Sequence, residues 1–255
     1  MTTDTEARVK SVDNALDVLD AIVELNGAGV TELADRLEIS KSAIYKHLST
    51  LEARGYVVRT ENDDYDLSFR WLRFGGYGRK RVPSLQRIQT ATRELANETD
   101  ELLLFATFSN NSSMSLYHSR GEKAVVTDSY TGKDLPLHCT ASGKAMLAAM
   151  GPDAEPVLDE IELSRHTDNT ITDRAELVDE LETIRQQGFA LEDQERIDGM
   201  RGIGAAVTDE HTGEVIGAFA LTGPAHRVEG EKFREKYPKL LVNRARELEI
   251  NITYE

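Results

Sequence analysis

The stretch Thr31-Glu-Leu-Ala-Asp-Arg-Leu37, followed by Glu38-Ile-Ser40 and Lys41-Ser-Ala-Ile-Tyr-Lys-His-Leu-Ser-Thr-Leu-Glu-Ala-Arg54, decides the fold of the N-terminal part of the chain. It predicts two helices, over 32–37 and 41–54, joined by a short turn. Thr31 and Ser40 precede these helices as N-cap residues, because their side-chain oxygens can accept a backbone N–H of the first turn. Two helices joined by such a turn form a helix-turn-helix.

The second of these helices has two faces of different chemistry. One face is apolar at helical spacing, through Ile44, Leu48 and Leu51. The opposite face is polar and consists of Ser42, Tyr45, Lys46 and Ser49. It carries no carboxylate before Glu52, and Ser, Tyr and Lys can reach base edges or phosphates in a major groove. The face predicts DNA binding, and an ordinary solvated helix pair is the alternative interpretation.

The segments on either side complete a winged helix. Upstream, Ser11 is expected to cap a helix that ends at Asn26-Gly27. Its predicted apolar face comprises Ala15, Leu16, Leu19, Ile22 and Val23. Downstream, residues 56–60 and 65–67 have the composition of strands around a turn, which predicts a hairpin directly after the second helix of the motif. We therefore expect a winged helix-turn-helix domain over residues 8–68.

Charge is distributed unevenly along the 255 residues. The total of 45 acidic and 30 basic residues gives a net charge of −15, which by itself argues against a nucleic-acid partner. Residues 36–60, however, contain five basic and two acidic residues, whereas residues 82–255 contain 18 basic and 31 acidic ones. This asymmetry indicates two modules with different partners. The carboxylate surplus favours a host with concentrated intracellular salt, and a simple acidic protein is the alternative.

Residues 69–82 predict a linker that begins as a short helix and continues as a hinge at the glycines 75, 76 and 78. In residues 83–255, strands and helices alternate. Strands are expected over 101–108, 113–119, 123–129, 202–208 and 214–222. Helices are expected over 84–98, 142–150, 174–187 and 231–249. This pattern predicts an α+β domain that binds a ligand.

Three blocks of the chain resemble the IclR family of transcriptional regulators. They are the helix-turn-helix block over 29–56, the segment Leu135-Pro-Leu-His-Cys-Thr-Ala-Ser-Gly-Lys-Ala-Met-Leu-Ala148, and the segments over 187–195, 199–207 and 221–224. The last two blocks are specific to the family, and the resemblance covers about residues 8–250. It implies an N-terminal winged helix-turn-helix domain and a C-terminal GAF/profilin-like effector-binding domain. It also implies a homodimer or a dimer of dimers, with small organic acids, sugar acids or aromatic compounds as effectors.

Candidate contact residues follow for both modules. The predicted DNA-binding residues are Thr31, Ser40, Lys41, Ser42, Tyr45, Lys46, His47, Thr50 and Arg59. The effector-binding positions that the resemblance implies are Thr140, Ser142, Gly143, Lys144, Glu192, Gly202, Ala220 and Thr222. The backbone amides of residues 142–144, at a helix start, are expected to form an anion or carbonyl site. Lys144 either points into this site or is solvated.

The remaining patterns argue against an enzyme. The segment before Lys144 lacks the P-loop glycine and is followed by Ala145 instead of Ser or Thr, and neither a Gly-x-Ser-x-Gly nor a His-Glu-x-x-His motif occurs. The single Cys139 excludes an intramolecular disulfide and a Cys-rich metal site. No cofactor is expected, and no cluster of ligands in the sequence demands a metal. His138 and Cys139 are expected to pack in the core, and a sensing role is the alternative.

No stretch is long and apolar enough to span a bilayer, and the N-terminus lacks a signal-peptide core, so no membrane partner and a cytoplasmic location are expected. The sequence favours a DNA-binding regulator whose operator binding responds to a small molecule. The alternative is a sensor that acts through protein–protein contacts instead of DNA.

Overall fold

The computed structural model describes residues 9–253 and divides into two compact units, Met1–Gly78 and Arg79–Glu255. The boundary falls inside the segment 69–82 that the sequence predicts as a linker. Positions 8, 254 and 255, at the ends of the predicted domains, lie outside the described residues.

The first unit is a three-helix bundle with a hairpin. It contains α1 (Lys10–Glu24), α2 (Val30–Leu37), α3 (Lys41–Ala53) and the strands β1 (Val57–Arg59) and β2 (Tyr65–Leu67). The two strands pair antiparallel, and an isolated bridge between Ala28 and Tyr65 ties the loop before α2 to the hairpin. The core is built from apolar side chains of all these elements, including Val18, Ile22, Leu33, Ile44, Leu48 and Val57. This arrangement confirms the predicted winged helix-turn-helix.

Local details of this unit correct the sequence analysis. Ser40 accepts the N–H of Ala43 at 3.3 Å, as predicted. Thr31 is not a cap, because α2 already begins at Val30, after Gly29. Ser11 likewise lies inside α1, whose N-cap is Val9.

The predicted apolar face of α1 is also wrong in part. Leu16 and Val23 are 51% and 48% exposed, while Val18 and Ala21 are buried. Both sets recur at helical spacing, and only the packing of α1 on α2 and α3 selects one of them. Leu51 on α3 is half-buried and packs at the margin of the core.

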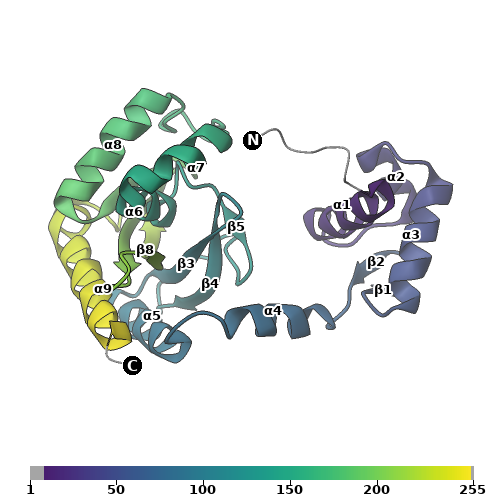
Figure 1. Cartoon of the computed structure of the whole chain (residues 1–255), viewed down its shortest axis with the longest axis horizontal. Coiled ribbons are helices and arrows are strands. Elements are labelled where there is room, and N and C mark those ends of the chain that lie inside the picture. The colour runs from purple at the N-terminus through teal and green to yellow at the C-terminus, as the bar shows by residue number, and fades with distance from the viewer. Residues whose placement is uncertain (1–8, 254–255) are drawn as a thin grey trace. The chain divides into compact units, whose positions relative to one another are not determined.

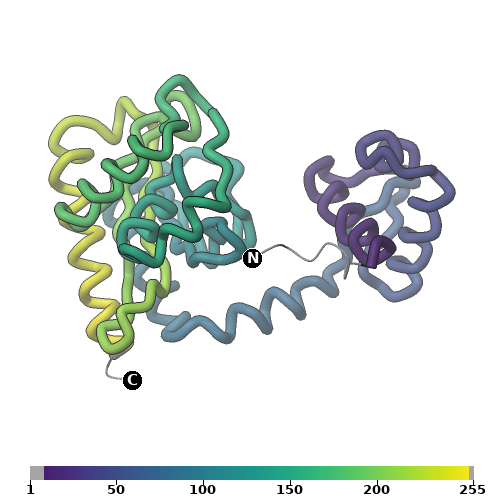
Figure 2. Tube along the Cα trace, turned by 45° about the horizontal axis from the view of Figure 1, so that its top comes forward, coloured from purple at the N-terminus to yellow at the C-terminus, as the bar shows by residue number. Residues whose placement is uncertain are grey.

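The predicted hinge is helical. The helix α4 (Trp71–Arg79) includes Gly75, Gly76 and Gly78, and its course can be followed in Figure 2. Its start is held on the hairpin side of the first unit, where Trp71 Nε1 donates to the carbonyl oxygen of Tyr56 at 2.9 Å. Each glycine costs a helix about 1 kcal/mol relative to Ala. We infer that α4 owes its stability mainly to the contacts at its start.

The second unit is built on one antiparallel sheet. Its strands are β3 (Leu102–Ser109), β4 (Ser112–Arg120), β5 (Asp134–Leu135), β6 (Ala190–Asp193), β7 (Met200–Thr208) and β8 (Val215–Pro224), in the order β5-β4-β3-β8-β7-β6. The helices α5 (Leu85–Thr99) and α9 (Tyr237–Thr253) cover one face. The other face is covered by α6 (Ala141–Met150), α7 (Glu155–Glu160) and α8 (Arg174–Gln187) (Figure 1). A 3-10 turn (Gly151–Ala154) precedes α7, and a π-helical turn (Lys232–Lys236) precedes α9.

Alternation along the strands separates the two cores of this unit. Leu103 and Phe105 of β3 pack toward α5 and α9, whereas Leu104 and Ala106 pack toward α6 and α8. Small residues let the start of α6 lie close to the sheet, because a Cβ on Gly204 would lie 2.1 Å from the carbonyl oxygen of Ala141. The predicted α+β class is confirmed, and the fold fixes the first turn of α6 over the middle of the sheet.

Residues 123–129, predicted as a strand, form no strand. The short strand β5 pairs with the beginning of the outer edge of β4, where Ser113 lies opposite Leu135. Among the helices within residues 9–253, none is long and apolar enough to cross a membrane.

Candidate DNA-binding surface and effector cavity

The outward face of α3 carries most of the predicted DNA-binding residues. Burial of Ile44 and Leu48 in the core turns the opposite side of the helix outward. This exposed side presents Lys41, Ser42, Tyr45, Lys46, Ser49 and Thr50, and His47 is half-buried at its margin. The structure thus brings these residues together on one surface that lacks carboxylates before Glu52. Hydroxyl, ammonium and phenol groups on one helix face can contact phosphates and base edges.

Three further candidates lie at the start of α3 or on elements that contact it. Ser40 is exposed at the N-cap of α3, and Thr31 is exposed in the first turn of α2. Arg59 lies on the hairpin, and its guanidinium is 3.2 Å from the carboxylate of Asp63 at the hairpin tip. Because this ion pair is exposed, it is weak and can exchange for a phosphate.

In the second unit, five of the eight predicted effector-binding residues line one small cavity. These are Thr140, Ser142, Glu192, Ala220 and Thr222. The cavity lies between the start of α6 and the strands β3 and β8, and its volume is about 30 Å³. Its wall also includes Thr127, Ser129 and Arg196, which the sequence analysis did not identify.

The first turn of α6 corrects the expected anion site. The hydroxyl of Thr140 accepts the N–H of Gly143 at 3.1 Å, and the backbone carbonyl of Thr140 accepts that of Lys144 at 2.9 Å. Two of the three amides over 142–144 are therefore already bonded within the helix cap. Gly143 packs against the preceding loop, since a Cβ there would lie 2.3 Å from the carbonyl oxygen of Leu137. Neither Gly143 nor Lys144 is among the residues that line the cavity.

Lys144 takes neither of the two orientations considered from the sequence. It is fully buried, and its ammonium lies 2.6 Å from Glu195 and 3.2 Å from Glu180. A buried ammonium is stable only when carboxylates of this kind compensate its charge. Lys144 therefore belongs to an ion cluster beneath the cavity.

Glu192 joins the cavity to the turn that follows β6. Its Oε1 accepts the backbone N–H of Glu195 at 2.7 Å and of Arg196 at 3.2 Å. Its Oε2 faces Gly202, where a Cβ would lie 3.0 Å from this oxygen. Burial raises the pKa of Glu192 to about 7, although the two backbone hydrogen bonds oppose the shift. Near neutral pH this carboxyl is partly protonated and can both donate and accept hydrogen bonds.

A second charged pair lies at the cavity wall. The guanidinium of Arg196 donates to Asp128 at 2.5 Å, and this bond lowers the pKa of the Asp128 carboxyl. The two residues are 68 positions apart, and no motif or spacing in the sequence connects them.

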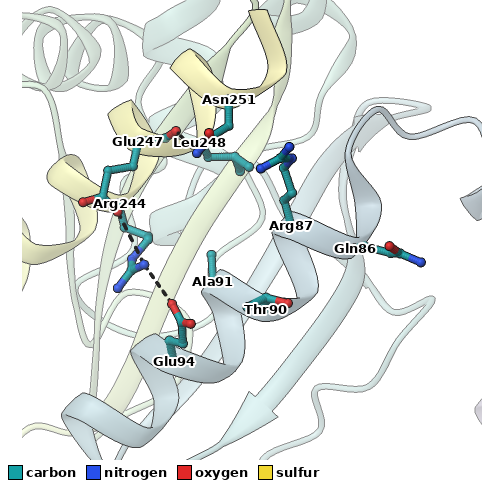
Figure 3. Close-up of a pocket in the computed structure, with 9 residues that line it drawn as sticks. All are labelled: Gln86, Arg87, Thr90, Ala91, Glu94, Arg244, Glu247, Leu248 and Asn251. Carbon is teal, nitrogen blue, oxygen red and sulfur yellow. Dashed lines mark hydrogen bonds and ion pairs between the residues drawn. The ribbon is translucent and has the colours of Figure 1, made fainter. Parts of the chain in front are cut away.

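A larger concavity lies elsewhere in the second unit. It is an open groove of about 360 Å³ between α5 and α9, shown in Figure 3. Arg244 donates to Glu94 at 2.8 Å across it. The groove is on the face of the sheet opposite α6, and none of the predicted effector-binding residues lines it. We therefore place the candidate effector site at the smaller cavity.

One group of possible metal ligands occurs in the described part of the chain. Ligand atoms of His138, Cys139 and His166 lie within 4.8 Å of one another. His138 and Cys139 are buried in the core, as expected. Burial raises the pKa of the Cys139 thiol to about 12. His138 also uses its Nε2 in a 3.0 Å hydrogen bond with the carbonyl oxygen of Ser164.

Comparisons with known proteins cover both units. Residues 11–61 match the model of the IclR helix-turn-helix domain, and residues 80–250 match that of the bacterial transcriptional regulator IclR C-terminal domain. A relative described as the probable HTH-type transcriptional regulator ArcR of Halobacterium salinarum is 30% identical over 250 residues, which are 96% of this chain and 94% of that protein.

Solved structures agree with these matches. The IclR of Thermotoga maritima aligns with a TM-score of 0.75 at 26% identity, and the alignment covers 97% of this chain and 100% of that protein. An IclR homolog from Microbacterium hydrocarbonoxydans, solved with 4-hydroxybenzoate, has a TM-score of 0.80 at 20% identity and covers 96% of this chain and 100% of its own. At 20% identity, the likeness to the Microbacterium hydrocarbonoxydans homolog shows only a shared fold.

Proposed function

The chain belongs to the IclR family of transcriptional regulators, and from this premise we propose that its α3 surface reads an operator while an organic acid binds at the α6 cavity. The observation that carries the proposal is the exposed face of α3, which presents Ser42, Tyr45 and Lys46 without a carboxylate, beside the hairpin. In this reading the three side chains contact base edges, while Lys41, Thr50 and Arg59 contact phosphates. The protein acts by binding and not by catalysis.

A homodimer, or a dimer of dimers, is the proposed assembly. Support comes from an apolar stripe on the exposed side of α1, formed at helical spacing by Val12, Leu16 and Val23. Exposed apolar residues of this kind mark interaction surfaces. A second copy of the chain covers the stripe in this proposal, and the dimer places two α3 helices about 34 Å apart, in successive major grooves.

The effector is proposed to be a small organic acid or sugar acid. The homolog from Microbacterium hydrocarbonoxydans was solved with an aromatic acid, 4-hydroxybenzoate, and its fold matches this chain. In this protein the cavity combines Arg196, which can hold a carboxylate, with hydroxyl groups and the partly protonated Glu192. Binding at the cavity would favour one arrangement of the assembly and so alter operator affinity.

A cytoplasm with concentrated salt, in a halophilic archaeon, is the proposed setting. The net charge of −15 and the relative in Halobacterium salinarum support it. In such a setting counterion release contributes little to DNA binding, so operator affinity should depend only weakly on salt.

Charge reversal on α3 tests the DNA-binding part. Fluorescence anisotropy with DNA from upstream of the gene and its neighbours should give saturable, sequence-selective binding that persists in molar KCl. Lys46→Glu should abolish this binding, because it places a carboxylate against phosphate. Lys236→Glu is the matched control, since it makes the same charge change on an exposed residue of the second unit and should leave binding unchanged.

The alternative of a sensor that acts through protein contacts predicts a different result. Lys46→Glu and the wild type would then bind the same DNA equally, with no sequence selectivity at any salt concentration. Sedimentation equilibrium with Leu16→Glu tests the dimer separately: the wild type should be a dimer or tetramer, and the variant should shift toward the monomer.

A further inference from the structure

The cavity lined by the predicted effector residues is small. Its volume of about 30 Å³ holds about two water molecules. Cavities that bind organic ligands usually measure about 300–1,000 Å³. An acid of several carbon atoms therefore enters only if part of the wall moves.

Most of the wall belongs to packed, regular elements. Leu104 of β3, Ala141 of α6 and Ala220 of β8 are buried in the core of the second unit. Thr127 and Ser129, by contrast, belong to residues 124–131, which contain no helix or strand. We name residues 124–131 the strap. Its ends are anchored, because Lys123 donates its N–H to the carbonyl oxygen of Asp100 and Gly132 donates to that of Ser115.

Asp128 ties the middle of the strap to the cavity wall through an ion pair. Asp128 accepts a 2.5 Å hydrogen bond from Arg196, while Lys133 approaches the same carboxylate only to 4.0 Å. The side chain of Arg196 is 18% exposed and lines the cavity, whereas that of Asp128 is 50% exposed. Val126, close to this contact, is 81% exposed and adds no packing. The strap is thus closed by an ion pair that water can reach from one side.

Arg196 is also the only cation among the residues that line the cavity. Its partner Asp128 is a carboxylate, so an acid entering the cavity offers Arg196 the same pairing that Asp128 provides. Such an exchange leaves the guanidinium compensated and returns Asp128 to water, where an exposed carboxylate costs little. A neutral ligand offers no comparable exchange.

We propose that Arg196 binds the carboxylate of the effector in place of Asp128, and that this exchange releases the strap and opens the cavity. The inference rests on the proposed function, since it requires that an acid effector binds at this cavity. It adds the residue that selects an acid and the segment that moves.

Hydrogen exchange of the full-length protein, measured by mass spectrometry over the strap, tests whether the ion pair between Asp128 and Arg196 holds the strap. Asp128→Asn keeps the size of the side chain and removes its charge, so exchange in residues 124–131 should rise about fivefold. Arg196→Met should raise it equally. Asp159→Asn is the matched control, because it removes an exposed ion pair between Asp159 of α7 and Arg174 of α8 and should leave the strap unchanged. Equal strap protection in all four proteins would overturn the proposal.

Acetate, a small carboxylate, tests the exchange of partners. Replacing KCl by potassium acetate at constant ionic strength should raise strap exchange in the wild type toward the level of Asp128→Asn. It should have no effect in Arg196→Met, which has lost the binding group. Acetate without effect on the wild type, or with equal effect on Arg196→Met, would overturn the proposal. Operator binding measured by anisotropy is a separate readout, so failure here does not imply failure of the DNA-binding reading.

Discussion

Replacing Lys144 by Met should destabilise the second unit strongly. The ammonium of Lys144 is fully buried between Glu195, at 2.6 Å, and Glu180, at 3.2 Å. The side chain of Glu195 is only 9% exposed, and its Oε2 has no hydrogen-bond partner among the described residues. Removing one member of a buried ion pair leaves the other charge uncompensated, which costs about 3–5 kcal/mol. For a domain of this size the melting temperature should fall by roughly 10 °C.

The stability that Lys144→Met removes should depend on pH. Burial already raises the pKa of Glu195, and Lys144 opposes that rise. Without the lysine the pKa of Glu195 in the folded state moves further above its unfolded value. The folded state then binds a proton more readily than the unfolded state, so stability falls as pH rises through this range. The destabilisation by Lys144→Met should be larger at pH 8 than at pH 5.

Differential scanning calorimetry of the full-length protein is the appropriate assay, because two units need not unfold together. The single tryptophan, Trp71, lies in the first unit, and its fluorescence identifies the transition of that unit. The double variant Lys144→Met with Glu195→Gln removes both charges and should recover most of the loss. Lys239→Met is the control, since its exposed pair with Glu235 at 3.4 Å contributes at most about 1 kcal/mol.

Two results would refute this reasoning. One is a loss no larger than that of Lys239→Met, which would mean that the cluster is not a buried ion pair in solution. The other is unchanged stability together with a lost response to acids, which would make Lys144 an effector contact, as the family resemblance implies.

Three smaller perturbations follow from the same structure. Burial raises the pKa of Glu192 from 4.5 to about 7, so the wild type loses stability as pH rises through that interval, by up to about 3 kcal/mol. Glu192→Gln keeps the hydrogen-bond acceptor, so its free energy of unfolding in urea should lose this difference between pH 5 and pH 8. A pH dependence equal to that of the wild type would contradict the expectation. Gly204→Ala puts a Cβ 2.1 Å from a backbone carbonyl oxygen of α6 and should cost about 1–3 kcal/mol by calorimetry, whereas Gly76→Ala, with open space around it, should not destabilise the protein. Ser40→Ala should lower the free energy of unfolding of the first unit by about 1 kcal/mol, because the helix cap is lost, whereas Thr31→Ala should change it almost not at all. Unfolding followed by tryptophan fluorescence measures both variants, and equal effects would refute the assignment of the cap.

The predictions that held rest on information that is local in the chain. Apolar spacing in α3 predicted which side of the helix is buried, and Ser40 predicted where the helix begins. The polar face of α3 follows from the same periodicity, because the side opposite a buried stripe is exposed. Local pattern alone could not choose between two stripes of α1, where Leu16 turned outward and Val18 inward.

The family resemblance implied the segments that meet at the cavity, whereas the sequence by itself determined the two modules, the class of each and the polar face of α3. These depend on periodicity, capping and charge within windows of a few residues. Only the tertiary structure decided where Lys144 points, that residues 123–129 find no strand partner, and that Arg196 pairs with Asp128 at the cavity wall. The physical reason is sequence distance. Lys144 and Glu195 are 51 positions apart, and Arg196 and Asp128 are 68 apart, so these charges meet only after the sheet has brought their segments together.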